Sequence, residues 1–140
     1  MATFPSEEWT KLYVELINGS KEYAEAADTW EGDVAFVFEA EPENGVPETL
    51  RAWFDLWHGE CRSFRYGIDE AEAGKSQFVF TAPYSRWKDI IRKDLDPIKG
   101  IMQGKIKLKG DLPRVVRYVK ASNELVNLAT EVPTEFIDGA

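Results

Sequence analysis

The stretch LDPIKGIMQGKIKLKGD, residues 95–111, decides the fold that we expect for this chain. Asp96 followed by Pro97 is a favourable N-cap and first-turn pair, so it predicts the start of a short helix. Gly104 is placed to end that helix, because glycine readily adopts the left-handed conformation that follows a helix C-terminus. An apolar helix is therefore expected over 97–103.

A segment of alternating character follows this helix directly. KIKLK, residues 105–109, carries aliphatic side chains on one side and lysines on the other, which is the period of a strand with one buried face. Gly110 and Asp111 then turn the chain and cap a last helix, expected over 111–129. The stretch therefore predicts a short apolar helix joined by glycine to a strand with one apolar side.

Hydrophobic periodicity predicts the rest of the secondary structure. Ser6 and Ser20 are the expected N-caps of two N-terminal helices, and Ser85 is the expected N-cap of a further helix that carries Trp87, Ile90 and Ile91. Strands are expected at 33–41, 49–57, 61–68, 77–82 and 105–109, with the polar segment 69–76 as a loop. Helices followed by consecutive strands indicate an α+β fold, with a five-stranded, largely antiparallel sheet covered by helices.

The composition fits a single domain. The chain has 140 residues, of which 44 % are hydrophobic and 13 % aromatic, and this is enough apolar surface for one substantial core. We expect one domain over 1–140, with N-terminal helices over about 6–29, the sheet and its helices over about 32–129, and a C-terminal tail over 130–140.

The charge is negative overall but unevenly distributed. The formal net charge is −8 at pH 7 and the isoelectric point is about 4.7, which argues against nucleic acid as a partner. Residues 92–120 hold nine Lys or Arg and three Asp, a net charge of +6 that leaves −14 for the remainder. Two interpretations of this basic segment stay open: a solvated face, or a patch for anionic headgroups or phosphates.

The sequence offers little for catalysis or metal binding. His58 is the only histidine and lies three residues before the only cysteine, Cys61, which is too few ligands for a zinc site. The acidic residues around the loop PENGVP, 42–47, are expected to be solvated, and GKS at 74–76 lacks the upstream glycine of a phosphate-binding loop. We therefore expect no catalytic residue, no metal site and no cofactor, in a protein that is not an enzyme.

Two further features bear on the compartment. A single cysteine cannot form an intramolecular disulfide and fits a reducing environment. The N-terminus MATFPSEEWTK shows no basic and apolar targeting pattern, and the chain nowhere has 18 consecutive apolar residues. We therefore expect a cytoplasmic protein.

Large apolar side chains are the most informative remaining feature. They lie on the predicted strands and on the short helices that follow: Phe36, Phe38, Trp53, Phe64, Phe78, Phe80, Trp87, Ile90, Ile91, Ile98 and Met102. A packed core is one interpretation of this set. The other is a cavity that binds apolar ligands, because helix breaks at 94–97 and 100–104 interrupt the covering layer and Met102 is an adaptable side chain.

The opening stretch also resembles the signature of the sterol carrier protein type 2 family. An Asp-Pro-started helix, a Gly-Lys-aliphatic-Lys strand and a Gly-Asp turn are matched by Asp96, Pro97, Gly104, Lys105, Ile106, Lys107, Gly110 and Asp111. FVFTAPYSRWKDIIRKDLDP resembles the strand and Trp-bearing helix of the family, and VPTEF at 132–136 resembles its C-terminal segment. The resemblance is specific over about 78–136.

This resemblance implies a five-stranded sheet with helices on one side, enclosing a tunnel for fatty acyl chains, fatty acyl-CoA, sterols or other lipids. It implies binding and transport without catalysis. The helix 97–103 and the strand 105–109 would form one wall and rim of the tunnel, which adds Gln103, Ile106 and Leu108 to the expected ligand-binding residues.

The resemblance also favours a functional interpretation of the basic segment. The expected anion-binding residues are Lys105, Lys107, Lys109 and Arg114. They would hold phosphates or draw the protein transiently to an anionic membrane surface.

A function of a different class stays open. Trp53 and Trp57 lie on a predicted hairpin that, like the loop EPENGVPE at 41–48, does not map onto the family. A contiguous apolar patch on this hairpin would indicate an accessory or interaction module for a partner enzyme, or a homodimer.

Overall fold

Five strands form the main sheet of the computed structural model, which describes residues 1–139. Their spatial order is β4 (Glu60–Tyr66), β3 (Leu50–Trp57), β2 (Glu31–Glu39), β5 (Phe78–Pro83) and β6 (Lys107–Lys109). β2 and β5 pair in parallel, and the other neighbouring pairs are antiparallel. The α+β class and the largely antiparallel sheet are therefore confirmed. Ala140, the end of the expected tail, lies outside the described residues.

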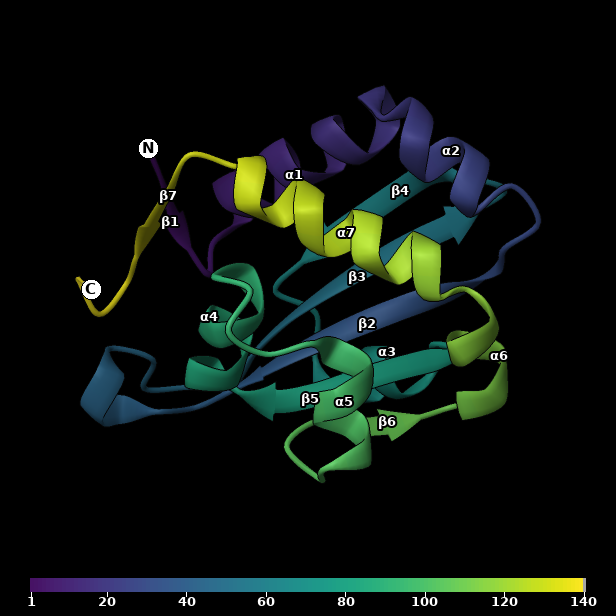
Figure 1. Ribbon diagram of the computed structural model, residues 1–140. Coiled ribbons are helices and arrows are strands. Elements are labelled where there is room, and N and C mark those ends of the chain that lie inside the picture. The colour runs from purple at the N-terminus through teal and green to yellow at the C-terminus, as the bar shows by residue number, and fades with distance from the viewer. Residues whose placement is uncertain (140) are drawn as a thin grey trace.

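Most of the helices cover one face of this sheet (Figure 1). The helices are α1 (Glu7–Gly19), α2 (Lys21–Ala26), η1 (Pro42–Asn44, a 3-10 turn), α3 (Glu70–Gly74), α4 (Tyr84–Ile91), α5 (Pro97–Met102), α6 (Leu112–Arg117) and α7 (Val119–Glu131). α1 packs beside β4, α7 lies against α1, α2 and α4, and Figure 1 shows α5 in front of β5. α3 packs on the opposite face, against β2 and β3.

Side-chain caps begin four helices where the sequence predicts them, whereas α4 begins at Tyr84 after Pro83 and not at the predicted cap Ser85. Ser6, Ser20, Asp96 and Asp111 each accept a hydrogen bond from a backbone N–H group of the following turn. These bonds pair donors that the start of a helix otherwise leaves unsatisfied. The short helices of the covering layer are therefore delimited by local chemistry.

Three short elements differ from the sequence-based expectation. β1 (Ala2–Phe4) pairs in parallel with β7 (Thr134–Phe136), so the N-terminus and the expected tail form a separate two-stranded sheet. The expected loop 69–76 contains α3, which Asp69 caps and which buries Ala73. Elements of three to five residues are too short to show a period, and this is why the sequence did not reveal them.

The last helix is also divided, whereas the sequence predicts one helix over 111–129. The break lies at Tyr118, with φ −104° and ψ 38°, between α6 and α7. The Tyr118 hydroxyl is hydrogen-bonded to Thr29 Oγ1 at 2.8 Å. A partner so distant in the sequence cannot be read from local periodicity.

The two glycines that flank β6 have positive φ angles but different surroundings. Gly104 has φ +75° and open space where a side chain would begin. Gly110 has φ +138°, and a Cβ there would lie 2.7 Å from Phe78 Cδ1 and 3.0 Å from the Gln77 carbonyl oxygen. The turn after β6 therefore requires glycine for space as well as for conformation.

We predict that Gly110→Ala lowers the free energy of unfolding by about 2–3 kcal/mol, because it adds a clash to the strain of a positive φ angle. Gly104→Ala is the matched control. Its conformational cost alone should lower the free energy of unfolding by about 1 kcal/mol. Urea denaturation followed by circular dichroism measures both values. Equal losses for the two variants would contradict the close packing of Gly110 on Phe78.

Candidate ligand-binding pocket

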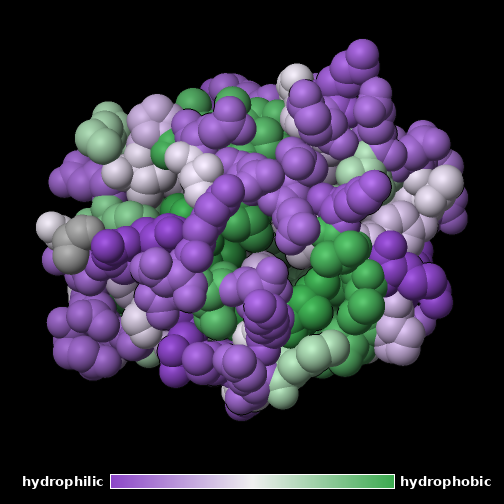
Figure 2. All heavy atoms as spheres, in the orientation of Figure 1, coloured by the Kyte–Doolittle hydropathy of each residue, from purple (hydrophilic) through white to green (hydrophobic). Residues whose placement is uncertain are grey.

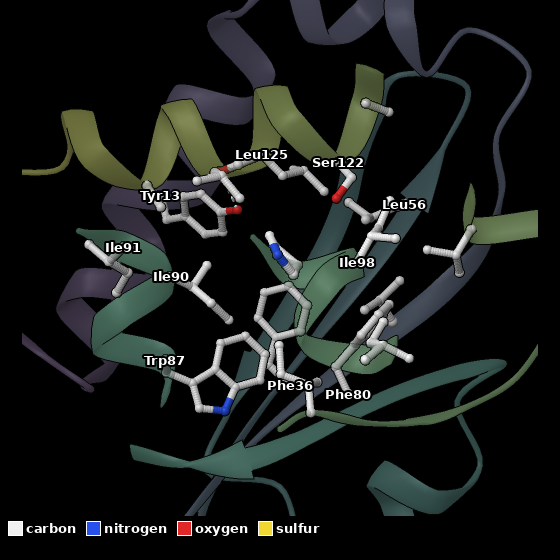
Figure 3. Close-up of a pocket in the computed structure, with 18 of the residues that line it drawn as sticks. Tyr13, Phe36, Leu56, Phe80, Trp87, Ile90, Ile91, Ile98, Ser122 and Leu125 are labelled. Carbon is white, nitrogen blue, oxygen red and sulfur yellow. Dashed lines mark hydrogen bonds between the residues drawn. The ribbon is translucent and has the colours of Figure 1, made fainter. Parts of the chain in front are cut away.

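An apolar pocket lies between the covered face of the sheet and the helices (Figure 3). Its cavity volume is about 120 Å³. Side chains from β1, β2, β3, β5, α1, α2, α4, α5, α6 and α7 line it. The pocket is therefore a product of the whole tertiary arrangement. Figure 2 shows apolar side chains gathered around a hollow on this side of the molecule, between polar surroundings.

Alternate residues of the central strands form the floor of the pocket. Val34, Phe36 and Phe38 of β2 and Phe80 of β5 point toward the helices, because successive side chains of a strand alternate between its faces. Phe36 and Phe80 are only half-buried, although both lie on central strands beneath the helical layer. The open space above their rings accounts for this incomplete burial.

Trp87 positions α4, which forms one wall of the pocket. Its indole N–H donates to the carbonyl oxygens of Val37 at 2.9 Å and Ala82 at 3.1 Å, which belong to the adjacent strands β2 and β5. Its ring packs against Phe36 and Phe38, with centroid distances of 4.8 and 5.0 Å. These contacts fix α4 over one end of the sheet.

The opening stretch of the sequence supplies another wall. Ile98 and Ile101 of α5 line the pocket together with Ile106. Gly100 allows α5 to lie close to this isoleucine, since a Cβ on Gly100 would be 2.7 Å from Ile106 Cδ1. The Gly100 carbonyl oxygen also accepts hydrogen bonds from the N–H groups of Lys105 and Ile106, at 2.8 and 3.1 Å. Helix and strand are thus joined in one unit.

The remaining wall comes from helices that the sequence does not connect with a ligand. Tyr13 of α1, Tyr23 of α2, and Ser122 and Leu125 of α7 line it, and the Tyr13 hydroxyl donates to the Leu125 carbonyl oxygen at 2.9 Å. The available signal was the helical spacing of Trp9 and Tyr13. That spacing predicts a buried stripe, but the sequence does not say which space the stripe faces.

The pocket wall is apolar because the indole groups in it are bonded within the protein. The N–H groups of Trp9 and Trp30 donate to Thr134 Oγ1 at 2.8 Å and to the Gly32 carbonyl oxygen at 2.9 Å. No charged side chain within residues 1–139 lines the pocket. Such a wall suits hydrocarbon, whose burial removes apolar surface from water.

The structure brings eight of the fourteen predicted ligand-binding residues to this pocket. They are Phe36, Phe38, Phe80, Trp87, Ile90, Ile91, Ile98 and Ile106. The other six do not line it: Trp53, Phe64, Phe78, Met102, Gln103 and Leu108.

Each of these six has a physical reason for its position. Trp53 lies on the opposite face of the sheet, and its indole N–H donates to Asp33 at 2.8 Å. Phe78 is covered by Trp30, at a centroid distance of 4.9 Å. Met102 and Gln103 are exposed. The last two, Phe64 and Leu108, are half-buried against the main core.

The four predicted anion-binding residues do not gather at the pocket. None of them lines it. Arg114 donates to the Glu31 carbonyl oxygen, and its guanidinium lies over the Trp30 ring. Lys109 donates to the Gly74 carbonyl oxygen of α3, so it belongs to the opposite face of the sheet, whereas Lys105 and Lys107 are exposed. Headgroup binding by this set stays a prediction.

The tryptophan hairpin is also less apolar at its surface than its sequence suggests. Trp53 is half-buried, with the Arg65 guanidinium 5.6 Å from its ring centroid. Trp57 is 37 % exposed, but His58 stacks on its ring and Arg62 lies over it at 4.6 Å. The interaction module and the homodimer stay predictions.

Metal-binding clusters and membrane-spanning helices are both absent from residues 1–139. No group of three or more His, Cys, Asp or Glu side chains in this range is placed to hold a metal ion. None of the helices in this range has the length and apolar character needed to cross a membrane.

The fold and the pocket thus define an α+β protein with an apolar cavity between sheet and helices. The model of the SCP-2 sterol transfer family matches residues 13–121. The chain belongs to this family, and the resemblance seen in the sequence is confirmed. Members of this family are generally lipid carriers, which supports lipid binding.

Solved structures agree with this assignment. A crystal structure of sterol carrier protein 2 is 34 % identical over 91 % of this chain and 97 % of that chain, with a TM-score of 0.82. A conserved hypothetical protein from Thermus thermophilus, described as possibly a sterol carrier protein, is 33 % identical over 92 % and 89 %, with a TM-score of 0.80.

Apo sterol carrier protein 2 from Yarrowia lipolytica is more distant. It is 15 % identical over 90 % of this chain and 96 % of that chain, with a TM-score of 0.58, and so shares the fold. A search of curated proteins finds no significant match.

We predict that Trp87→Phe lowers the free energy of unfolding by about 1–3 kcal/mol, because the buried carbonyl oxygens of Val37 and Ala82 lose their shared donor. Trp57→Phe, at an exposed position, is the matched control and should change it by less than about 0.5 kcal/mol. Urea denaturation measures both. A loss no larger for Trp87 than for Trp57 would contradict the role given to the indole N–H.

We also predict that the protein loses stability at alkaline pH. Burial is the main cause that raises the pKa of the Cys61 thiol from 9.0 to about 11, and it also raises the pKa of the Tyr13 phenol. A pKa that is higher in the folded state gives stability that is complete below the unfolded pKa and is lost as the pH rises through the folded one. The free energy of unfolding should therefore fall from pH 9 to 11, less steeply in Cys61→Ala. Parallel slopes for the two proteins would exclude this contribution of the thiol.

Proposed function

We propose that this chain is a non-catalytic carrier that binds a lipid or another long apolar molecule in the pocket between sheet and helices. One observation carries the proposal: Phe36 and Phe80 on the central strands remain half-buried under a wall that no charged side chain lines, within residues 1–139. Family membership supports it, because a carrier needs an apolar space inside the fold.

The size of the cavity implies movement on binding. Its volume of about 120 Å³ is near that of an engineered cavity which holds benzene, about 150 Å³, and below the usual ligand pocket of about 300 Å³ or more. A long chain therefore needs a wall to shift. α5 is the natural candidate, since Lys93 and Gly104 beside it have φ angles of 62° and 75° and α5 is joined to the fold by short turns.

The first test is to identify what the protein carries. Protein purified from a lipid-rich host is extracted with organic solvent, and the extract is analysed by mass spectrometry. A near-stoichiometric acyl or isoprenoid compound is expected. An empty extract, together with unchanged tryptophan fluorescence on addition of fatty acid or fatty alcohol, would refute the carrier function.

We predict that Ile98→Asp lowers the affinity for an apolar ligand at least about tenfold, because it places a charge in the apolar wall. Met102→Asp is the matched control on the same helix, since Met102 is 67 % exposed and does not line the pocket. Titration with a fluorescent fatty alcohol measures both affinities, and circular dichroism checks folding. Equal affinities for the two variants would place the ligand elsewhere.

A further inference from the structure

Some hydroxyl groups in the pocket wall are hydrogen-bonded within the protein, and others are not. The hydroxyls of Tyr13 and Tyr118 are hydrogen-bonded within the protein, to the Leu125 carbonyl oxygen and to Thr29 Oγ1. Two other hydroxyls in the wall, those of Tyr23 and Ser122, form no hydrogen bond with any residue in 1–139. Tyr23 is 1 % exposed, so its hydroxyl has little access to bulk water.

These two hydroxyls belong to neighbouring helices. Tyr23 lies on α2 and Ser122 on α7, and the two helices pack against each other. Figure 3 shows the Ser122 oxygen pointing from α7 into the pocket, on the side away from Trp87 and Ile90. The part of the pocket under α4 is lined by indole and aliphatic groups. We call the side between α2 and α7, where these two hydroxyl-bearing residues lie, the polar end of an otherwise apolar pocket.

The chemistry of this polar end discriminates between ligand headgroups. Burial raises the pKa of the Tyr23 phenol, which therefore remains protonated and can donate a hydrogen bond at neutral pH. An ionised carboxylate would lose its hydration here without gaining a countercharge, because no charged side chain within residues 1–139 lines the pocket. A neutral hydroxyl or carbonyl oxygen loses fewer interactions with water, and two protein hydroxyls can replace them.

We infer that Tyr23 and Ser122 are specificity-determining residues, which select a neutral long-chain molecule with a terminal oxygen group over the hydrocarbon and over the fatty-acid anion. This inference rests on the proposed carrier function, whose ligand class it narrows. The terminal oxygen lies between α2 and α7, and the chain extends toward α4.

The test compares three molecules of equal chain length: dodecan-1-ol, dodecane and dodecanoate. Their affinities for the full chain are measured at about pH 8, where the Tyr23 phenol is protonated, by displacement of diphenylhexatriene. The unaltered protein is compared with Tyr23→Phe and Ser122→Ala. Ser76→Ala is the matched control, because the Ser76 hydroxyl is buried without a partner and lies outside the pocket.

The unaltered protein should bind dodecan-1-ol most tightly. Each pocket variant should weaken that affinity about fivefold, the effect of one hydrogen bond, and leave the affinity for dodecane unchanged. Ser76→Ala should change neither. Each variant removes only one hydroxyl group, and circular dichroism checks that it still folds. A loss of affinity can therefore be told apart from a loss of folding.

Three results would overturn the inference. Equal affinities for the alcohol and the hydrocarbon, tighter binding of dodecanoate, or an unchanged alcohol preference in both variants would each do so while the carrier function stands. If diphenylhexatriene and all three molecules fail to bind the folded protein, the carrier function fails and the inference fails with it.

Discussion

The two hydrogen bonds from the indole of Trp87 are the interaction on which the pocket depends. They join α4 to β2 and β5, the parallel pair at the centre of the sheet, through the carbonyl oxygens of Val37 and Ala82. With α4 fixed over one end of the sheet, the chain crosses in front of β5 to reach β6, and α5 forms on that path (Figure 1). The space between α4, α5 and α7 remains open above Phe36 and Phe80.

Hydrogen bonds from indole N–H groups to the protein also keep this space apolar. A buried N–H group without a partner is costly, so each indole in the wall is bonded to the protein, and its ring faces the pocket as hydrocarbon. Tyr23 and Ser122 are the exceptions, and they lie on adjacent helices. In the carrier function that we propose, these hydroxyls are left to the ligand.

The two faces of the sheet differ in how closely their side chains pack. α3 covers a small second core that includes Trp53 and Val79, where side chains pack closely. The longer helices cover the other face, where the aromatic side chains leave a cavity between helices and sheet. The cations of the basic segment lie on both faces of the sheet: Lys109 contacts α3, whereas Arg114 lies over Trp30.

Eight of the residues predicted from the sequence line the pocket. They stand at alternate positions of β2 and β5, on the apolar sides of α4 and α5, and at Ile106 just before β6. Strand alternation and helical spacing place such residues on the correct face without further information. The sequence was less successful for Trp53, because alternation defines two faces without saying which one the long helices cover. It also could not connect Tyr13, Tyr23 and Ser122 with the same space.

The sequence by itself therefore determined the five strands of the main sheet, the helices that Ser6, Ser20, Asp96 and Asp111 cap, the glycine joints at Gly104 and Gly110 and the family, because each depends on neighbouring residues or on a contiguous motif. Only the tertiary structure decided where the cavity lies and which hydroxyls face it. Those features arise where α1, α2, α5 and α7, distant in the sequence, meet over one sheet. Contacts between such segments depend on the topology, and local periodicity does not record them.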